Sequence, residues 1–137
     1  MELSLFTVEM AVRDYECDLQ GVVNNAVYQN YLEHARHEYL KSIGIDFAAL
    51  AARGINLVVT RAEIDYKFSL TSGDRFLVAV KPERLSPVRL GFRQEIYLLP
   101  ERKVVVKALI TGTALNAKGR PQIPGELEEA LSNSEKA

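Results

Sequence analysis

The chain changes from strand to helix within one stretch, Asp18-Leu19-Gln20-Gly21-Val22-Val23-Asn24-Asn25-Ala26-Val27-Tyr28. A carboxylate lies here on a short loop, just ahead of the only long helix that the sequence predicts. The two asparagines fall where that helix begins, so its free backbone N–H groups would face the same space as the carboxylate. An acid or nucleophile beside such an oxyanion site is sufficient to hydrolyse an activated acyl group.

Apolar residues at helical spacing follow this stretch. They recur over about five turns at Val27, Tyr28, Tyr31, Leu32, Ala35, Tyr39, Leu40 and Ile43. Asn24 or Asn25 supplies the N-cap, and Gly44 stands where a left-handed C-terminal cap belongs. A second, short helix is predicted from about Asp46 to Arg53.

Most of the remaining chain alternates between apolar and polar residues, as half-buried strands do. Strands are predicted over residues 5–14, 56–69, 74–84, 88–99 and 103–116. The order is one strand, a long helix, a short helix and four strands in a meander. This predicts an α+β fold in which one face of a five-stranded antiparallel sheet wraps around the long helix. Because an uncovered strand edge invites pairing, the apolar segment Ile55–Thr60 is predicted to form a dimer interface.

The bulk composition fits one globular domain. The chain has 137 residues, which is enough for one core but not for two. We expect the domain to cover residues 1–125 and a flexible acidic tail, either a frayed helix or disordered, to cover 126–137. A formal net charge of −1 gives no argument for a nucleic acid or an anionic membrane as partner.

The single cysteine, Cys17, and the start of the chain bear on location. One cysteine permits no internal disulfide, so a reducing compartment fits best. No apolar run approaches the ~18 residues of a membrane span. The start, Met1-Glu2-Leu3-Ser4, lacks the basic and apolar regions of a signal peptide. We therefore expect a cytoplasmic protein.

Asp18 supports two interpretations that the spacing weighs about equally. A loop aspartate ahead of a glycine often forms an Asx turn, which is a structural role. In the functional interpretation, Gly21 lets the backbone approach a ligand closely, and Asn25 follows in the first turn of the helix. An N–H from that turn would hold the oxygen that becomes negative in a tetrahedral intermediate. Asp18 would then act on the acyl carbonyl directly or through a water, with no metal required.

The neighbours of Asp18 have structural roles as alternatives. Either asparagine can cap the helix while the other presents its backbone or amide to a ligand. Tyr28, one turn further, fits the core better than a pocket. Cys17 lies next to Asp18 but has no basic partner nearby in the sequence, so a buried, inert thiol is the better interpretation.

A second carboxylate, Glu63, lies in a predicted strand. Glu63 and Asp65 share one face of that strand, opposite Ile64 and Tyr66. Most such carboxylates face solvent or pair with a base. If that face approaches the helix of a partner subunit, Glu63 becomes a second acid for the site.

A basic cluster surrounds the predicted turn at Ser86-Pro87. Its members are Lys81, Arg84, Arg89 and Arg93. The cluster is either a solvated hairpin end or a docking patch. The docking patch would hold the phosphates of coenzyme A or of a phosphopantetheine arm, or an acidic carrier protein.

These residues resemble a known family, the hotdog-fold thioesterases of the 4-hydroxybenzoyl-CoA thioesterase type. The resemblance rests on Val12-Arg13-Asp14-Tyr15-Glu16-Cys17-Asp18-Leu19-Gln20-Gly21-Val22-Val23-Asn24-Asn25-Ala26-Val27-Tyr28 and continues through Tyr31-Leu32-Glu33-His34-Ala35-Arg36. It extends more loosely to Arg120-Pro121-Gln122-Ile123-Pro124. Plant plastid and cyanobacterial acyl-acyl-carrier-protein thioesterases are similar in the run from Gly21 to Tyr28 and in His37-Glu38-Tyr39-Leu40.

The resemblance implies that the family's catalytic aspartate falls on Asp18 and its oxyanion N–H on Asn25. It also implies a homodimer with one joint sheet, often paired again into a homotetramer, with active sites at the subunit boundary. Relatives with a Gly-His-Val-Asn-Asn run have a histidine where Val22 stands, and some members have a histidine or an aromatic residue in place of Asn25. A mechanism that needs a histidine in this loop is therefore excluded.

We predict an enzyme that hydrolyses fatty acyl or β-ketoacyl thioesters of acyl carrier protein or coenzyme A, without a metal or cofactor. The predicted catalytic residues are Asp18 and Asn25, and the helix flank around Val27 and Tyr31 is predicted to line an acyl channel. The predicted substrate-binding residues are Gly21, Val23, Asn24, Tyr28, Glu63 and Arg89. The alternatives are an aromatic or naphthoyl-CoA thioesterase of the same family and a non-catalytic acyl-binding protein of this fold.

Overall fold

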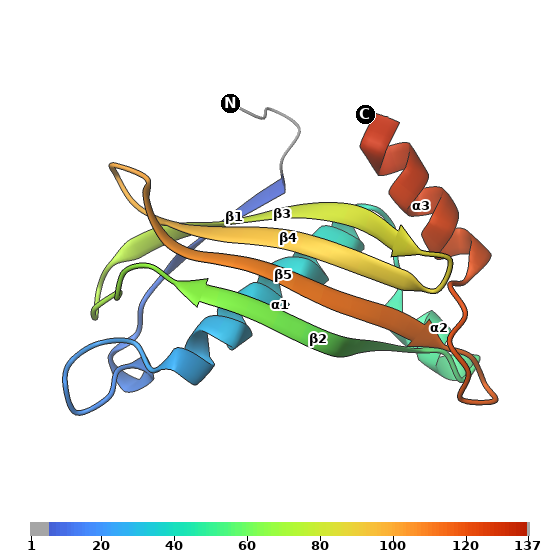
Figure 1. Cartoon of the computed structure of the whole chain (residues 1–137), viewed down its shortest axis with the longest axis horizontal. Helices are drawn as coiled ribbons and strands as arrows, with labels where there is room; N and C mark the ends of the chain where they lie inside the picture. The colour runs from blue at the N-terminus through green and yellow to red at the C-terminus, as the bar shows by residue number, and fades with distance from the viewer. Residues whose placement is uncertain (1–5, 137) are drawn as a thin grey trace.

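The computed structural model describes residues 6–136 (Figure 1). The described residues exclude Met1-Glu2-Leu3-Ser4, on which the expected lack of a signal peptide rests, and the last residue of the predicted tail. The elements are β1 (Phe6–Ala11), a single 3₁₀ turn η1 (Asp14–Glu16), α1 (Asn25–Ser42), α2 (Phe47–Ala52), β2 (Asn56–Tyr66), β3 (Arg75–Ser86), β4 (Arg89–Leu98), β5 (Lys103–Leu115) and α3 (Gly125–Lys136). In this described part of the chain, no helix is long and apolar enough to cross a membrane.

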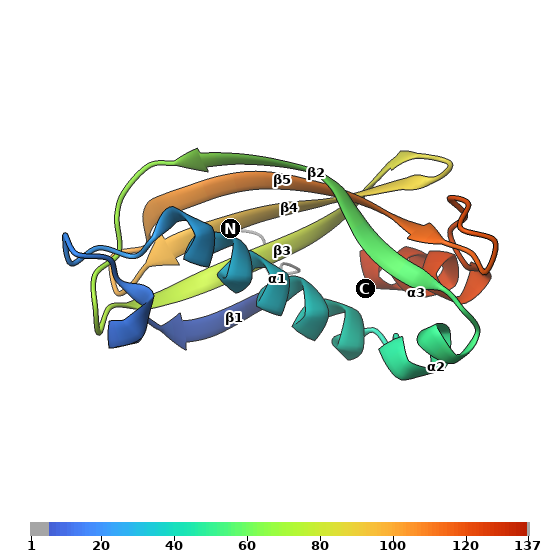
Figure 2. The same cartoon turned by 90° about the horizontal axis from the view of Figure 1, so that it is seen from below.

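The five strands form one antiparallel sheet in the order β1-β3-β4-β5-β2. The sheet curls around α1, so the two edge strands, β1 and β2, flank the helix (Figure 2). This confirms the predicted α+β hotdog architecture, a five-stranded antiparallel sheet wrapped around one long helix. The predicted four-strand meander is wrong for its first strand, because β2 pairs with β5 and not with β3.

The place beside β3 is taken by β1. Val8 lies opposite Val78 and Met10 opposite Phe76, and all four side chains belong to the core or pack against it. The connection from β2 to β3, residues 67–74, is longer than a tight hairpin loop. The two strands are therefore free to lie apart, and the apolar side of β1 covers β3 instead.

Helix α1 lies closer to β1 and β3 than to β2. Tyr31 packs on Phe76 of β3 with ring centroids 4.6 Å apart, and Tyr39 packs on Phe6 of β1 at 5.6 Å. Both tyrosines are buried. We call this side of α1 the packed flank, because aromatic contacts of this kind fix the helix in the sheet.

The edge strand β2 has two different faces, as the sequence predicts. Ile64 packs against the core, whereas Glu63 and Asp65 are exposed on the opposite, open face of the sheet. The register shifts between Val59 and Arg61, which marks a β-bulge. Val59 is 52% exposed, so part of this edge is apolar and uncovered in the single chain.

The last residues fold back onto the domain. Residues Gly125–Lys136 form α3, and Leu127 and Leu131 enter the core with only 1% and 6% of their surface exposed. The structure therefore differs from the predicted separate tail over 126–137. The two leucines lie four residues apart on one helical face, and the glutamates between them hide this pattern in the composition.

Candidate active site

Asp18 opens a tight turn that precedes α1. The Gly21 N–H donates to the Asp18 carbonyl at 3.0 Å, and the Asp18 N–H donates to the Val22 carbonyl at 2.9 Å. Gly21 has a φ of +80°, so the turn needs glycine for its backbone conformation. The Asp18 carboxylate accepts the Gln20 N–H at 2.9 Å, which confirms the Asx turn, and yet the side chain is exposed. The structural role thus leaves the carboxylate open to a substrate.

Helix α1 begins next to this turn with one backbone N–H left free. Asn24 is the N-cap, and its Oδ1 accepts the Ala26 N–H at 2.9 Å. The Val27 N–H donates to the Asn24 carbonyl, also at 2.9 Å. Nothing in the described residues 6–136 accepts the Asn25 N–H. Because the helix dipole places partial positive charge at this end, the Asn25 N–H is the donor available to a developing oxyanion.

Glu16 ties the Asp18 turn to the body of α1. Its Oε1 accepts the Tyr31 hydroxyl and the Arg13 N–H, each at 2.8 Å. Its carbonyl accepts the Asn24 N–H at 3.1 Å. Burial, and then the hydrogen bond to the Glu16 carboxylate, raise the pKa of Tyr31, so its hydroxyl keeps its proton. These bonds fix the turn against the start of the helix.

Val23 and Tyr28 support the site from the core and do not face it. Both side chains are buried. The Leu70 N–H donates to the Tyr28 hydroxyl, and the Val23 N–H donates to the Leu70 carbonyl, both at 2.9 Å. Burial raises the pKa of Tyr28. The structure therefore confirms the core role for Tyr28, and it leaves Val23 closed to a substrate in the single chain.

Glu63 and Arg89 lie away from Asp18 in the single chain. Glu63 is on the open face of the sheet, 3.4 Å from Arg61. Arg89 begins β4 at the β3–β4 hairpin, at the opposite end of the sheet from the Asp18 turn (Figure 1). Among the described residues its Nη1 is buried without a hydrogen-bond partner. Of the predicted site residues, the structure brings together four: Asp18, Gly21, Asn24 and Asn25.

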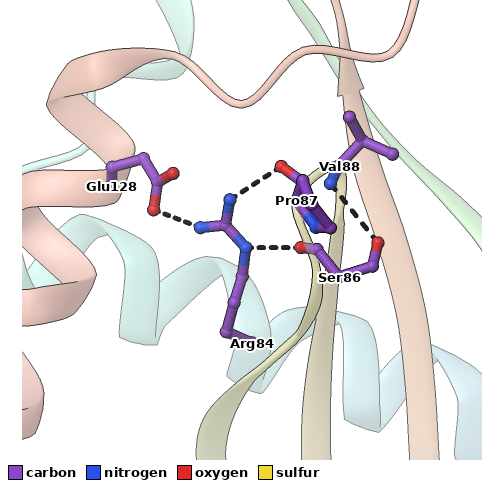
Figure 3. A network of polar contacts seen from close by, with 5 residues as sticks. All are labelled: Arg84, Ser86, Pro87, Val88 and Glu128. Atoms are coloured by element: carbon purple, nitrogen blue, oxygen red, sulfur yellow. Dashed lines mark hydrogen bonds and ion pairs between the residues drawn. The ribbon is translucent and has the colours of Figure 1, made fainter.

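The basic cluster at the β3–β4 hairpin is partly neutralised. Arg84 contacts Glu128 of α3 and donates to the carbonyl oxygens of Ser86 and Pro87 at 2.5 and 2.7 Å (Figure 3). Arg93 pairs with a glutamate of the neighbouring strand at 2.5 Å. Two of the four cations therefore hold the hairpin and α3 in place.

Two adjoining cavities lie along the side of α1 that faces β2, which we call the cavity flank. One, of about 250 Å³, begins at Gln29 and Asn30 near the start of the helix. The other, of about 310 Å³, extends to Phe47 of α2. The two share four lining residues: Glu33, Arg36, Val59 and Ile110. The larger cavity is otherwise mostly apolar and is lined by Leu40, Leu57, Leu90, Phe92 and Leu127 among others.

The predicted acyl channel around Val27 and Tyr31 is not where the cavities lie. Tyr31 is buried on the packed flank, and Val27 packs against the core. The cavities follow Gln29, Glu33 and Arg36 instead. Polar residues at this spacing are typical of a solvated helix face, so the sequence alone gave no signal for a pocket. It is the curl of the sheet that brings β2 over this flank (Figure 2).

Arg36, which lines both cavities, forms a polar pair with Gln94. Gln94 of β4 is 1% exposed, and its Nε2 donates to the Leu32 carbonyl at 2.9 Å. Its Oε1 accepts from Arg36 Nη1 at 3.1 Å. Burial lowers the pKa of Arg36, and the charge of Glu33 opposes that shift. No sequence pattern marks this pair, because 58 residues separate its members.

The fold and the site together define a class of protein. A curled five-stranded sheet encloses one helix, and an exposed carboxylate turn is fixed against the free N–H at the start of that helix. The family described as the thioesterase-like superfamily matches residues 12–131. The chain belongs to this family, the hotdog-fold thioesterases.

Individual relatives are similar over most of the chain. The chloroplastic acyl-acyl carrier protein thioesterase ATL2 of Arabidopsis thaliana is 42% identical over 83% of this chain and 61% of its own length. The long-chain acyl-CoA thioesterase FadM of Escherichia coli is 32% identical over 90% of this chain and 94% of its own length. The chain therefore spans less than two thirds of ATL2 but nearly all of FadM.

One solved structure shows the same fold. It is a 1,4-dihydroxy-2-naphthoyl-CoA thioesterase from Synechocystis, which matches with a TM-score of 0.88. The match covers 94% of this chain and 96% of that one, at 21% sequence identity. At this identity the similarity supports the shared fold and says nothing about the substrate.

Proposed function

We propose that this chain hydrolyses the thioester of a fatty acyl or β-ketoacyl group carried by acyl carrier protein or coenzyme A. One observation carries the proposal. The exposed Asp18 carboxylate lies in the turn that directly precedes α1, Asn25 at the start of α1 keeps a free N–H, and Glu16 ties the turn to the helix. The names of ATL2 and FadM, an acyl-acyl carrier protein and an acyl-CoA thioesterase, support both carriers.

In this mechanism the thioester carbonyl oxygen accepts the Asn25 N–H. The Asp18 carboxylate either attacks the carbonyl carbon or takes a proton from a water that attacks it. The carbonyl oxygen becomes negative, and the N–H and the helix dipole stabilise that charge. Collapse breaks the C–S bond, and the carrier thiolate takes up a proton. In the first route water then hydrolyses the acyl-aspartate, and both routes yield the free acid.

An aliphatic acyl group fits the cavity flank better than an aromatic one. The two cavities follow α1 from Gln29 to Leu40 and reach Phe47, so together they extend along the helix. We expect a higher kcat/KM for a saturated fatty acyl-CoA than for a benzoyl- or naphthoyl-CoA thioester. A clear preference for the aromatic thioester would contradict this assignment.

We also propose that two chains pair through their β2 edges and that this dimer completes the site. The predicted interface segment Ile55–Thr60 includes Val59, which is 52% exposed. Leu19, next to Asp18, is also fully exposed at the tip of its turn. Apolar residues in these two places are suited to burial against a second copy. Light scattering should give at least twice the chain mass, or four times if dimers pair through the open face; a monomer would contradict the proposal.

The Asp18 assignment is tested with two variants. Asp18→Asn keeps an oxygen that accepts the Gln20 N–H, so the turn is preserved while the base or nucleophile is lost. We expect the hydrolysis rate to fall at least ~100-fold in Asp18→Asn and in Asp18→Ala. Asp65→Asn, an exposed aspartate on the open face, is the matched control and should keep the wild-type rate. A folded Asp18→Asn variant with an unchanged rate would exclude Asp18 from the chemistry.

A further inference from the structure

Helix α3 forms part of the wall of the larger cavity. Leu127 is 1% exposed, and it lines that cavity together with Leu40 and Phe47. Helix α3 lies beside the β3–β4 hairpin, on the same side of the sheet as α1 (Figures 1 and 2). Leu131, one turn later on α3, is also buried but does not line the cavity. The two leucines of α3 therefore differ in one respect, which is contact with the cavity.

Ion pairs hold α3 from two sides. Glu126 pairs at 2.6 Å with Arg53, just after α2, and Glu128 pairs with Arg84 of β3. Figure 3 shows that Arg84 is itself fixed by two carbonyl oxygens of the β3–β4 turn. Leu127 stands between the two glutamates in the sequence. Each pair is partly exposed and contributes little alone, but together they set the position from which Leu127 enters the cavity.

One face of α1 leads from the free N–H to this cavity. Asn25, Gln29 and Glu33 follow one another four residues apart, and Arg36 and Leu40 continue the row. Residues at this spacing lie on one face of a helix. At ~1.5 Å per residue, the path from Asn25 to Leu40 measures about 22 Å. An extended acyl chain whose carbonyl meets the Asn25 N–H therefore runs along the cavity flank and ends against α3.

We propose that α3 limits the length of the acyl chain and that Leu127 is a specificity-determining residue. This inference rests on the proposed thioesterase function. The occupant is the methyl end of a saturated chain, because most of the side chains that line the cavity with Leu127 are aliphatic or aromatic. A cavity of about 310 Å³ stands at the lower end of the ~300–1,000 Å³ of ligand pockets. A change in the volume of Leu127 thus alters the available length appreciably.

The test compares Leu127→Ala and Leu127→Phe with the wild type on saturated acyl-CoA thioesters that lengthen by two carbons at each step. The larger cavity of Leu127→Ala should raise the kcat/KM ratio of the longer to the shorter chains by about 10-fold or more. Leu127→Phe should lower that ratio to a similar extent. Leu131→Ala removes the same side chain one turn away and should leave the ratio unchanged.

The same variants distinguish a failure of the proposed role of α3 from a failure of the proposed thioesterase function. An unchanged ratio in folded Leu127→Ala and Leu127→Phe, with Asp18→Asn still inactive, would overturn the role of α3 and leave the thioesterase assignment intact. Binding is measured independently with the Asp18→Asn variant, in which acyl-CoA thioesters are expected to bind without turnover. In that background Leu127→Ala should shift the tightest-binding chain to a longer one. A shift of the same size in Leu131→Ala would show a general loosening of α3 and would contradict the proposal.

Discussion

The packed flank and the cavity flank of α1 lie on one helix, in one sheet, and differ in what covers them. On the packed flank, Tyr31 and Tyr39 meet Phe76 and Phe6 at ring distances of 4.6 and 5.6 Å. On the cavity flank, Phe47 has His37 as its aromatic neighbour, at 5.1 Å, and beyond it lies open space of about 310 Å³. Helix α1 therefore packs more closely against β1 and β3 than against β2, whose Tyr66 contacts Tyr28 at a ring distance of 5.7 Å.

The difference between the two flanks of α1 shows how a small domain combines stability with a binding site. Close packing of the kind found between α1 and β3 supplies the free energy of folding, and any void there is costly. A ligand site needs the reverse, an apolar space that stays open. Because the packed flank holds α1 against β1 and β3, the flank toward β2 remains available. The three predictions below test this division between the flanks.

The largest effect is expected for a phenylalanine on the packed flank. Phe76→Ala removes the partner of Tyr31 from a site with no exposed surface, and it should lower the free energy of unfolding by about 3–5 kcal/mol. Phe47→Ala removes the same side chain from a half-buried position on the cavity flank, and it should cost only ~1 kcal/mol. Urea unfolding at one fixed protein concentration measures both. Equal losses would show that the flanks do not differ in their contribution to folding.

An intermediate effect is expected for Gln94, which ties β4 to α1 through Arg36 and the Leu32 carbonyl. Gln94→Leu leaves the guanidinium of Arg36 and the Leu32 carbonyl without this partner, so it should cost about 1–3 kcal/mol. The exposed Gln122, which accepts a hydrogen bond from Asn116, is the matched control. Gln122→Leu should change the free energy of unfolding by less than ~0.5 kcal/mol. If both substitutions cost the same, the buried pair is not a structural link.

Much of the fold is readable in the sequence because it depends on local periodicity. The alternation of Ile64 and Tyr66 with Glu63 and Asp65 predicted the two faces of β2, and the structure confirms them. The order of the strands in the sheet is harder to predict from the sequence, because β1 and β2 are both apolar enough to lie beside β3. The choice between them depends on pairings such as Val8 with Val78, which no local pattern contains.

In the candidate site, too, features that depend on neighbouring residues could be predicted, and contacts between distant residues could not. Asp18, Gly21, Asn24 and Asn25 stand within a few residues of each other, so turn and capping preferences were enough to place them together. The contacts that sequence reasoning missed join distant residues. Arg36 meets Gln94 across 58 positions, and Tyr31 reaches Glu16 across 15.

A frayed helix is one of the two predicted alternatives for the C-terminal segment, but the packing of α3 into the core was not predicted. The composition of α3 is acidic and rich in small residues, which is typical of a tail. Only Leu127 and Leu131, four residues apart, carry an apolar face, and two leucines over a single turn make a weak signal. The residues that line the cavity together with Leu127 all come from earlier elements, α1, α2 and the strands. The two leucines alone do not predict that this segment packs on the domain; only the structure shows that Leu127 lines the cavity.

The smallest effect on stability is expected for Tyr31→Phe, which keeps the ring on the packed flank and removes only its hydrogen bond to Glu16. We expect a loss of about 1 kcal/mol in the free energy of unfolding. The rate should fall more than this loss suggests, by about 10-fold in kcat with KM unchanged, because the Asp18 turn is then less firmly fixed.

The matched control for that variant is Tyr97→Phe. Tyr97 also donates its hydroxyl to a glutamate, Glu95, but on the open face of the sheet, so its loss should leave kcat unchanged.

Glu16→Gln keeps an acceptor for Tyr31 and should retain more activity than Glu16→Ala. Because burial raises the pKa of Tyr31, its hydroxyl stays protonated below the ordinary tyrosine value of ~10, and the loss in kcat should be the same at every pH of a neutral assay. A loss that varied across that range, or an equal loss in Tyr97→Phe, would mean that Tyr31 does not position the Asp18 turn.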